Sequence, residues 1–149
     1  MPSGYQNNIT IKEAIDHIDH QEYLLTSIQR KFVWSASQIE TLFDSIMRGY
    51  PINSFMFWHI QDAGIKKNFK FYKFLSAYRE FFQVNNPDFD AIGCSDFYAV
   101  IDGQQRLTSL YLGLKGSYAY KMPRKWWADS KRLLNHIHKT KRRYCLDII

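Results

Sequence analysis

The segment from Asp102 to Arg106 reads Asp-Gly-Gln-Gln-Arg and combines residue types that suit a phosphate. Gly103 lets the backbone approach a phosphate closely, and Arg106 offers a planar guanidinium that can bind two phosphate oxygens at once. Gln104 and Gln105 add neutral hydrogen-bond donors. Together these side chains predict a site for a ligand that carries phosphate groups.

Asp102 has two interpretations at this point. A carboxylate directly before a helix can act as its N-cap by accepting hydrogen bonds from backbone amides, and the residue type by itself favours this cap. The same carboxylate could instead hold Mg²⁺ beside the phosphates, since Mg²⁺ in proteins usually takes one or two carboxylates and keeps several waters. Asp102 is therefore also a candidate metal ligand.

Arg30 is the second basic candidate, and it follows Gln29 in an aromatic-rich stretch that ends at Trp34. Rigid neighbours would hold its guanidinium in a fixed place, from which it could bind phosphate opposite Arg106. The alternative is structural: the guanidinium packs on Trp34 or pairs with an acid.

Other candidate centres are weaker. His17 and His20 lie one helical turn apart, and His136 and His138 form a second pair. Neither pair is accompanied by further ligands at a metal-binding spacing, so we expect surface histidines. The sequence also lacks a Walker A motif and the Gly-x-Gly-x-x-Gly pattern.

The elements around 102–106 explain why this segment could bind an anion. Residues 97–101 predict a strand, and residues 105–112 predict the start of a helix with apolar positions at helical spacing. A strand that leads into a glycine turn and a helix N-terminus presents free backbone amides and the positive end of the helix dipole.

The rest of the chain also alternates between strands and helices. Thr10 with Glu13, and Ser35 with Gln38, form capping-box patterns that predict helices over about 11–20 and from about 36 to Gly49. Shorter patterns predict an extended piece at 23–25, a core strand at 54–60, strands at 67–72 and 143–149, a helix at 74–82 and a loop at 83–96. This alternation predicts an α/β or α+β domain with a small mixed sheet and flanking helices.

Composition limits the class of protein. With 149 residues, of which 46% are hydrophobic, the chain fits a single domain over 1–149 with its own core. No apolar run approaches the length of a membrane span and the start does not resemble a signal peptide, so we expect a cytoplasmic protein. Cys94 and Cys145 are too few and too isolated for a disulfide framework, and both are expected as free thiols.

The net charge of +6 is unevenly distributed. Residues 1–114 hold ten Lys and Arg against twelve Asp and Glu, whereas residues 115–143 hold ten against one. This basic segment is interleaved with aromatic residues, a pattern that suits nucleic acid but equally a solvated surface. Its candidate DNA-binding residues are Lys121, Arg124, Lys125 and Trp126.

Three blocks of sequence, taken in order, resemble the N-terminal domain of GmrSD-type restriction endonucleases. They are residues 28–34 with Gln29 and Arg30, residues 48–52, and residues 101–110 with the Asp-Gly-Gln-Gln-Arg segment. The resemblance covers about residues 10–120. It implies a fold similar to ParB and sulfiredoxin, in which a Gly-x-x-Arg turn binds nucleotide phosphates.

The resemblance also implies a function in defence against foreign DNA, which can carry modifications. Nucleoside triphosphate, with Mg²⁺, would be bound and hydrolysed by this domain to license DNA cleavage. The implied catalytic residues are Asp102, Gln105 and Arg106, with Asp102 at the metal, and the implied nucleotide-binding residues are Gln29, Arg30, Gly103, Gln104 and Arg106.

The family's HNH-type nuclease centre has no counterpart in residues 115–149, so we expect that centre on a separate domain or subunit. The strand pattern at the very end of the sequence favours a fragment of a longer protein. A second hypothesis remains open, in which the domain is a DNA-binding or modified-DNA-sensing module without turnover that uses the basic segment 115–143.

Overall fold

The computed structural model describes residues 8–28, 31–80, 82 and 84–119. In chain order the elements are α1 (Ile11–Asp19), β1 (Tyr23–Thr26), α2 (Ala36–Met47), β2 (Met56–Ile60), α3 (Ala63–Asn68), β3 (Phe71–Tyr72), β4 (Ala77–Arg79), β5 (Asp88–Phe89), β6 (Phe97–Asp102), α4 (Gln104–Leu114) and β7 (Ser117–Ala119). This arrangement confirms the mixed α and β class. The likeness to ParB and sulfiredoxin stays a prediction.

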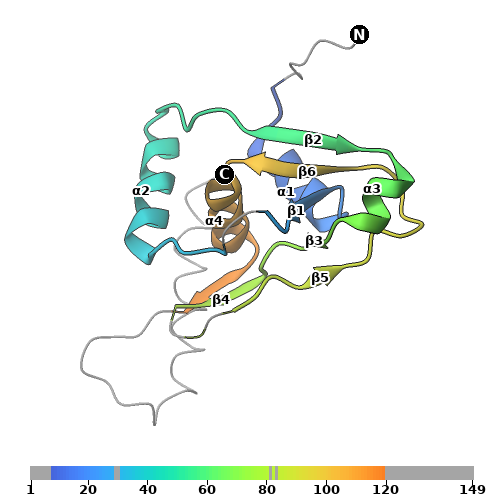
Figure 1. Ribbon diagram of the computed structural model, residues 1–149. Helices are drawn as coiled ribbons and strands as arrows, with labels where there is room; N and C mark the ends of the chain where they lie inside the picture. The colour runs from blue at the N-terminus through green and yellow to red at the C-terminus, as the bar shows by residue number, and fades with distance from the viewer. Residues whose placement is uncertain (1–7, 29–30, 81, 83, 120–149) are drawn as a thin grey trace.

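Five strands form one mixed sheet in the order β2-β6-β1-β3-β5 (Figure 1). β1 and β6 are parallel neighbours, and the remaining pairs in this sheet are antiparallel. β4 and β7 form a separate parallel pair. The parallel pairing of β1 with β6 brings the carboxyl ends of both strands to the same edge of the sheet, where α4 begins.

The core lies on both faces of this sheet. α1 and α4 cover one face, where Ile18 and Leu107 pack with Leu25 and Val100. α3 lies on the other face, where Ile65 packs against a cluster that includes Phe97. Figure 1 shows α1 behind the strands and α4 beyond the end of β6. The pairing of β6 with β1 on one side and β2 on the other fixes its register, and therefore the position of the turn that follows it.

The local signals for two helices are confirmed. At α1, the Thr10 hydroxyl accepts from the Glu13 amide while the Glu13 carboxylate accepts from the Thr10 amide at 2.7 Å. At α2, the Gln38 side chain accepts from the Ser35 amide at 3.0 Å. The extended piece at 23–25 is β1, and the strand and helix on either side of Gly103 are β6 and α4.

Several predicted elements differ from the structure. The predicted helix at 74–82 is wrong, because residues 77–79 form strand β4 beside β7. The predicted core strand at 54–60 is an edge strand with Met56 59% exposed. Residues 67–72 divide between the end of α3 and the two-residue strand β3, and the predicted loop at 83–96 contains β5.

None of the helices in the described part of the chain has the length and apolar character that a bilayer crossing requires. Cys94 is a free thiol, as predicted. The predicted strand at 143–149 and Cys145 lie outside the described residues.

Candidate functional site

The site is centred on the turn between β6 and α4. β6 ends at Asp102, Gly103 is the N-cap with φ of +89°, and the first helical hydrogen bond runs from the Leu107 amide to the Gly103 carbonyl at 2.9 Å. The amides of the preceding helical residues therefore have no acceptor within the helix. The start of α4 borders a pocket of about 350 Å³, which is lined by Trp34, Ile101, Asp102, Gly103, Gln104, Gln105 and Arg106.

Only glycine fits at position 103. Its φ lies in the left-handed region, where a residue with a Cβ is strained. A Cβ there would also overlap the Phe55 ring and would lie 3.3 Å from an Arg106 guanidinium nitrogen. The absence of a side chain at this position keeps the helix N-terminus accessible from the pocket and lets Phe55 pack close to the turn.

The Arg106 guanidinium is fixed by three neighbours. It donates to the Ile52 carbonyl, lies 3.4 Å from an Asp102 carboxylate oxygen, and stacks over the Phe55 ring at 4.8 Å. Its side chain is 16% exposed. A guanidinium has five N–H donors. Two of them are used by these contacts among the described residues, so the group can keep its position and still donate to a ligand.

Asp102 is not the helix cap. The N-cap is Gly103, and Asp102 is the last residue of β6, so the capping interpretation of its carboxylate is wrong. The Asp102 side chain is 71% exposed and contacts Arg106 only loosely. An exposed carboxylate at the rim of the pocket is free to reach a cation.

The two glutamines of the turn are both buried but differ in their contacts. Gln104 is 7% exposed and lines the pocket. Gln105 is 9% exposed, and its side chain accepts from the Val33 amide at 3.0 Å and donates to the Lys31 carbonyl at 3.1 Å. Gln105 thus ties the segment 31–34 to the start of α4.

Two tyrosines hold the same segment from the other side. The Tyr78 hydroxyl donates to the Phe32 carbonyl at 3.4 Å, and the Tyr118 hydroxyl donates to the Trp34 carbonyl at 3.2 Å. Burial raises the pKa of both phenols, and the nearby Glu80 carboxylate raises it further. The phenols therefore stay protonated at neutral pH and can donate these hydrogen bonds there.

The structure brings together part of the predicted site. It places Asp102, Gly103, Gln104, Gln105 and Arg106 around one pocket. The predicted residues Gln29 and Arg30, and the predicted DNA-binding residues Lys121, Arg124, Lys125 and Trp126, lie outside the described residues. Lys31, which follows Arg30, is tied to Gln105 at the pocket.

The histidine pair of α1 has structural contacts. His17 Nδ1 contacts the Glu22 carboxylate, and His20 Nδ1 lies 2.8 Å from the Asp16 carbonyl. Within the described ranges, no cluster of three or more His, Cys, Asp or Glu side chains could hold a metal ion. His136 and His138 are not among the described residues.

Sequence reasoning missed the residues that support Arg106. Phe55 stacks beneath its guanidinium and Ile52 accepts from it, although both lie about fifty residues earlier in the chain. Residues 48–52 were one of the three blocks of the resemblance, but nothing in the sequence indicated that Ile52 contacts Arg106 at the pocket. Tyr78 was also missed, because it was assigned to a helix.

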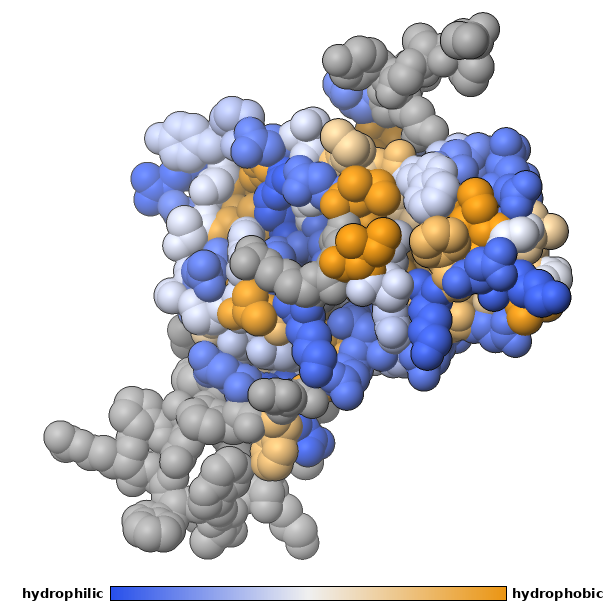
Figure 2. All heavy atoms as spheres, in the orientation of Figure 1, coloured by the Kyte–Doolittle hydropathy of each residue, from blue (hydrophilic) through white to orange (hydrophobic). Residues whose placement is uncertain are grey.

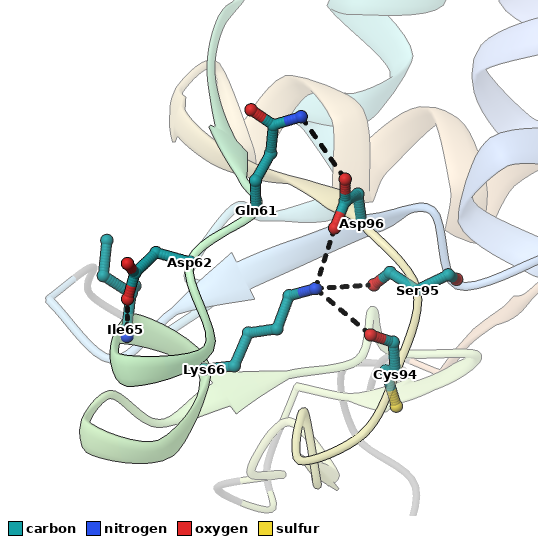
Figure 3. Close-up of polar contacts among 7 residues, drawn as sticks. All are labelled: Gln61, Asp62, Ile65, Lys66, Cys94, Ser95 and Asp96. Atoms are coloured by element: carbon teal, nitrogen blue, oxygen red, sulfur yellow. Dashed lines mark hydrogen bonds and ion pairs between the residues drawn. The ribbon is translucent and has the colours of Figure 1, made fainter.

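A second polar cluster lies at the opposite end of β6 (Figure 3). The Lys66 side chain, 9% exposed, donates to the Cys94 carbonyl at 3.1 Å, the Ser95 carbonyl at 3.3 Å and the Asp96 carboxylate at 2.9 Å. Gln61 donates to the other Asp96 oxygen at 3.3 Å. These bonds join α3 to the loop that enters β6.

Exposed hydrophobic side chains lie on β2 and β6, and one of them, Ile101, lines the pocket. Met56 is 59% exposed, Trp58 36% and Ile101 38%, and all three lie on β2 or β6. Figure 2 shows hydrophobic residues gathered on the face drawn there, over the ends of these two strands.

A comparison with protein-family models matches residues 11–149 to the GmrSD restriction endonuclease, N-terminal domain. The match covers nearly the whole sequence. The chain belongs to this family. A search of curated proteins found no significant match.

As a GmrSD N-terminal domain, the chain is part of a DNA restriction endonuclease, a class of defence protein whose substrate is DNA. Membership confirms the resemblance seen in the three sequence blocks. The first and third blocks meet in the structure, because Lys31 and Val33 contact Gln105.

Proposed function

We propose that this GmrSD N-terminal domain binds a nucleoside triphosphate at the turn 103–106 and hydrolyses it to license DNA cleavage by an HNH-type nuclease domain or subunit. The observation that supports this most is the pocket at the N-terminus of α4, where free amides, Gly103 and Arg106 converge. Backbone amides and the helix dipole favour anions at such a position. The ParB-like character of the Gly-x-x-Arg turn and a cytoplasmic location belong to the same proposal.

Each side chain has a defined part in this proposal. Arg106 binds phosphate oxygens through the donors that Ile52 and Asp102 leave available, and Gln104 donates from the helix start. Gln29 and Arg30, which precede the segment 31–34 in the sequence, would also bind the phosphates.

Mg²⁺ would be held at Asp102. The exposed carboxylate beside the pocket fits a cation that takes one or two protein ligands and completes its shell with phosphate oxygens and waters. The bound ion would neutralise charge on the phosphates. Asp102 and Arg106 would then be the catalytic residues, the first through the cation and the second through the charge that develops on the transferred phosphate.

Isothermal titration with ATP, GTP and CTP in the presence of Mg²⁺ tests the proposal. We expect one or more of these nucleotides to bind the native domain, and Arg106→Lys to weaken that binding about tenfold or more, since lysine keeps the charge but loses the planar fork.

Arg48→Lys is the matched control, because Arg48 lies at the end of α2 and pairs with Asp44 at an exposed position. It should bind like the native domain. Absence of heat from all three nucleotides, in protein whose thermal unfolding is cooperative, would reject the proposal.

The second candidate function is a DNA-binding module without turnover. It is favoured by the excess of ten basic residues over one acidic residue in 115–143. Lys121, Arg124, Lys125 and Trp126 would contact the backbone and unstacked bases. It predicts DNA affinity that persists without nucleotide and whose logarithm falls linearly with the logarithm of salt concentration. DNA affinity that requires nucleotide would count against it.

A further inference from the structure

One wall of the pocket is irregular backbone that needs side chains to hold it in place. Trp34 lines the pocket, and it lies in the segment 31–34, which belongs to no helix or strand. Val33 is 57% exposed, whereas Phe32 is 4% exposed and Trp34 packs against the same hydrophobic cluster. This packing anchors Phe32 and Trp34, and hydrogen bonds to the backbone of the segment fix its conformation between them.

Gln105 supplies two of these bonds from a single side chain. Its amide oxygen accepts from the Val33 amide and its amide nitrogen donates to the Lys31 carbonyl, as a neighbouring β-strand would. Tyr78 and Tyr118 hold the alternate carbonyls of Phe32 and Trp34. Gln105 is the only one of these three residues that also belongs to the phosphate-binding turn.

We propose that Gln105 is a positioning residue, which sets the segment 31–34 and its Trp34 side chain across the pocket from the N-terminus of α4. This inference rests on the proposed nucleotide site and assigns Gln105 a different role from catalysis. Both ends of its amide face backbone groups of the segment, and the side chain is 9% exposed. The first motif, which ends at Trp34, and the turn 102–106 are thereby held at a fixed separation.

The substitution Gln105→Glu tests this role through pH. An ionised glutamate would still accept from Val33 but would repel the Lys31 carbonyl, whereas a protonated glutamate would donate to it and restore both bonds. Burial against a carbonyl raises the pKa of such a carboxyl. We expect nucleotide affinity about tenfold below native at pH 8, with most of the loss recovered at pH 5.5.

The affinity is expressed as the ratio to the native domain at each pH. The other titratable or charged groups near Gln105 are Asp102, Arg106, Lys31, Tyr78 and Tyr118. These groups and the nucleotide phosphates are the same in the native domain and in Gln105→Glu, so their effect on affinity cancels in the ratio. Gln38→Glu is the control for the same change of charge, because Gln38 is exposed at the start of α2. Its ratio should stay near one at every pH.

Hydrogen exchange gives a readout that does not need nucleotide. The Val33 amide should exchange about tenfold faster in Gln105→Ala than in the native domain, because its acceptor is removed. Amides inside α4 provide the internal reference and should keep their protection, which shows that the variant is folded.

The outcomes separate this inference from the proposed function. If no nucleotide binds the native domain, the proposed function fails while the exchange of Val33 still tests the positioning role. Unchanged exchange of Val33 in Gln105→Ala would overturn the positioning role. It would also be overturned if Gln105→Glu bound nucleotide with native affinity at pH 8 and lost only turnover, because a catalytic residue behaves that way.

Discussion

The two ends of β6 carry the same kind of ion pair but use it differently. At the beginning of the strand, Lys66 lies 2.9 Å from Asp96, and at its end Arg106 lies 3.4 Å from Asp102. The Lys66 ammonium has three donors, and the carbonyls of Cys94 and Ser95 together with Asp96 occupy all of them. Nothing remains for a ligand.

The end of the strand is organised in the opposite way. Arg106 is held by the Ile52 carbonyl and the Phe55 ring, Asp102 is 71% exposed, and the first residues of α4 line the pocket. The comparison teaches that an ion pair by itself does not identify a functional site. A functional site is better indicated by donors that are held in position while some of them remain available to a ligand.

The largest expected effect belongs to the structural end. Lys66→Met should lower the free energy of unfolding by about 3 kcal/mol, because two backbone carbonyls and a carboxylate lose their common donor. Nucleotide affinity should stay native. Urea unfolding and calorimetric titration measure the two quantities.

Lys67→Met is the control for Lys66→Met, because Lys67 is the exposed next residue of α3. It should change neither quantity. Equal stability of the two variants would remove the distinction between the two ends of β6.

Gly103→Ala should have the next largest effect. The new Cβ would overlap Phe55 and force an unfavourable φ, so we expect about 2 kcal/mol of destabilisation and a loss of nucleotide binding. Gly93→Ala is the matched control, since Gly93 also has a positive φ of +74° but no atom within 4 Å of an added Cβ. Gly93→Ala should destabilise the domain less than Gly103→Ala and should bind nucleotide with native affinity. A Gly103→Ala variant that binds like the native domain would contradict the close approach at this turn.

The smallest effect concerns acid stability. The hydrogen bond from Lys66 holds the pKa of the Asp96 carboxyl below its ordinary value of 3.8, with a further contribution from Gln61. A carboxyl with a lowered pKa in the folded state stabilises the protein above the unfolded pKa, and that contribution is lost as the pH falls through the folded value. Asp96→Asn should therefore flatten the loss of stability below about pH 4. The free energy of unfolding, measured with urea between pH 3 and 7, should change with pH in parallel for the two proteins above pH 5. If Asp96→Asn lost stability below pH 4 as steeply as the native domain, this role of Asp96 would be contradicted.

The sequence predicted the parts of the fold that depend on neighbouring residues. Capping boxes at Thr10 and Ser35 located α1 and α2, and the strand, glycine and helix pattern located the turn at Gly103. These signals are local because a cap bonds to an amide three residues away.

The parts that depend on distant partners could not be read in this way. Phe74, Tyr78 and Phe82 have helical spacing, yet residues 77–79 pair with β7 about forty residues later, and tertiary pairing overrides the local pattern. The contacts of Arg106 with Phe55, and of Gln105 with Val33, also join residues that are far apart in sequence. The residue types at the turn were predictable, but the groups that orient them were not.

The most direct test of the nucleotide site is titration of the ¹⁵N-labelled domain with ATP, GTP or CTP and Mg²⁺ while backbone amide resonances are followed by NMR. The account predicts that the amides of Gly103, Gln104 and Arg106 shift progressively and saturate, while those of Ser95 and Asp96 at the other end of β6 do not move. Binding that shifts Ser95 and Asp96 and leaves the turn unchanged, or no shift at the turn with any of the three nucleotides, would contradict it.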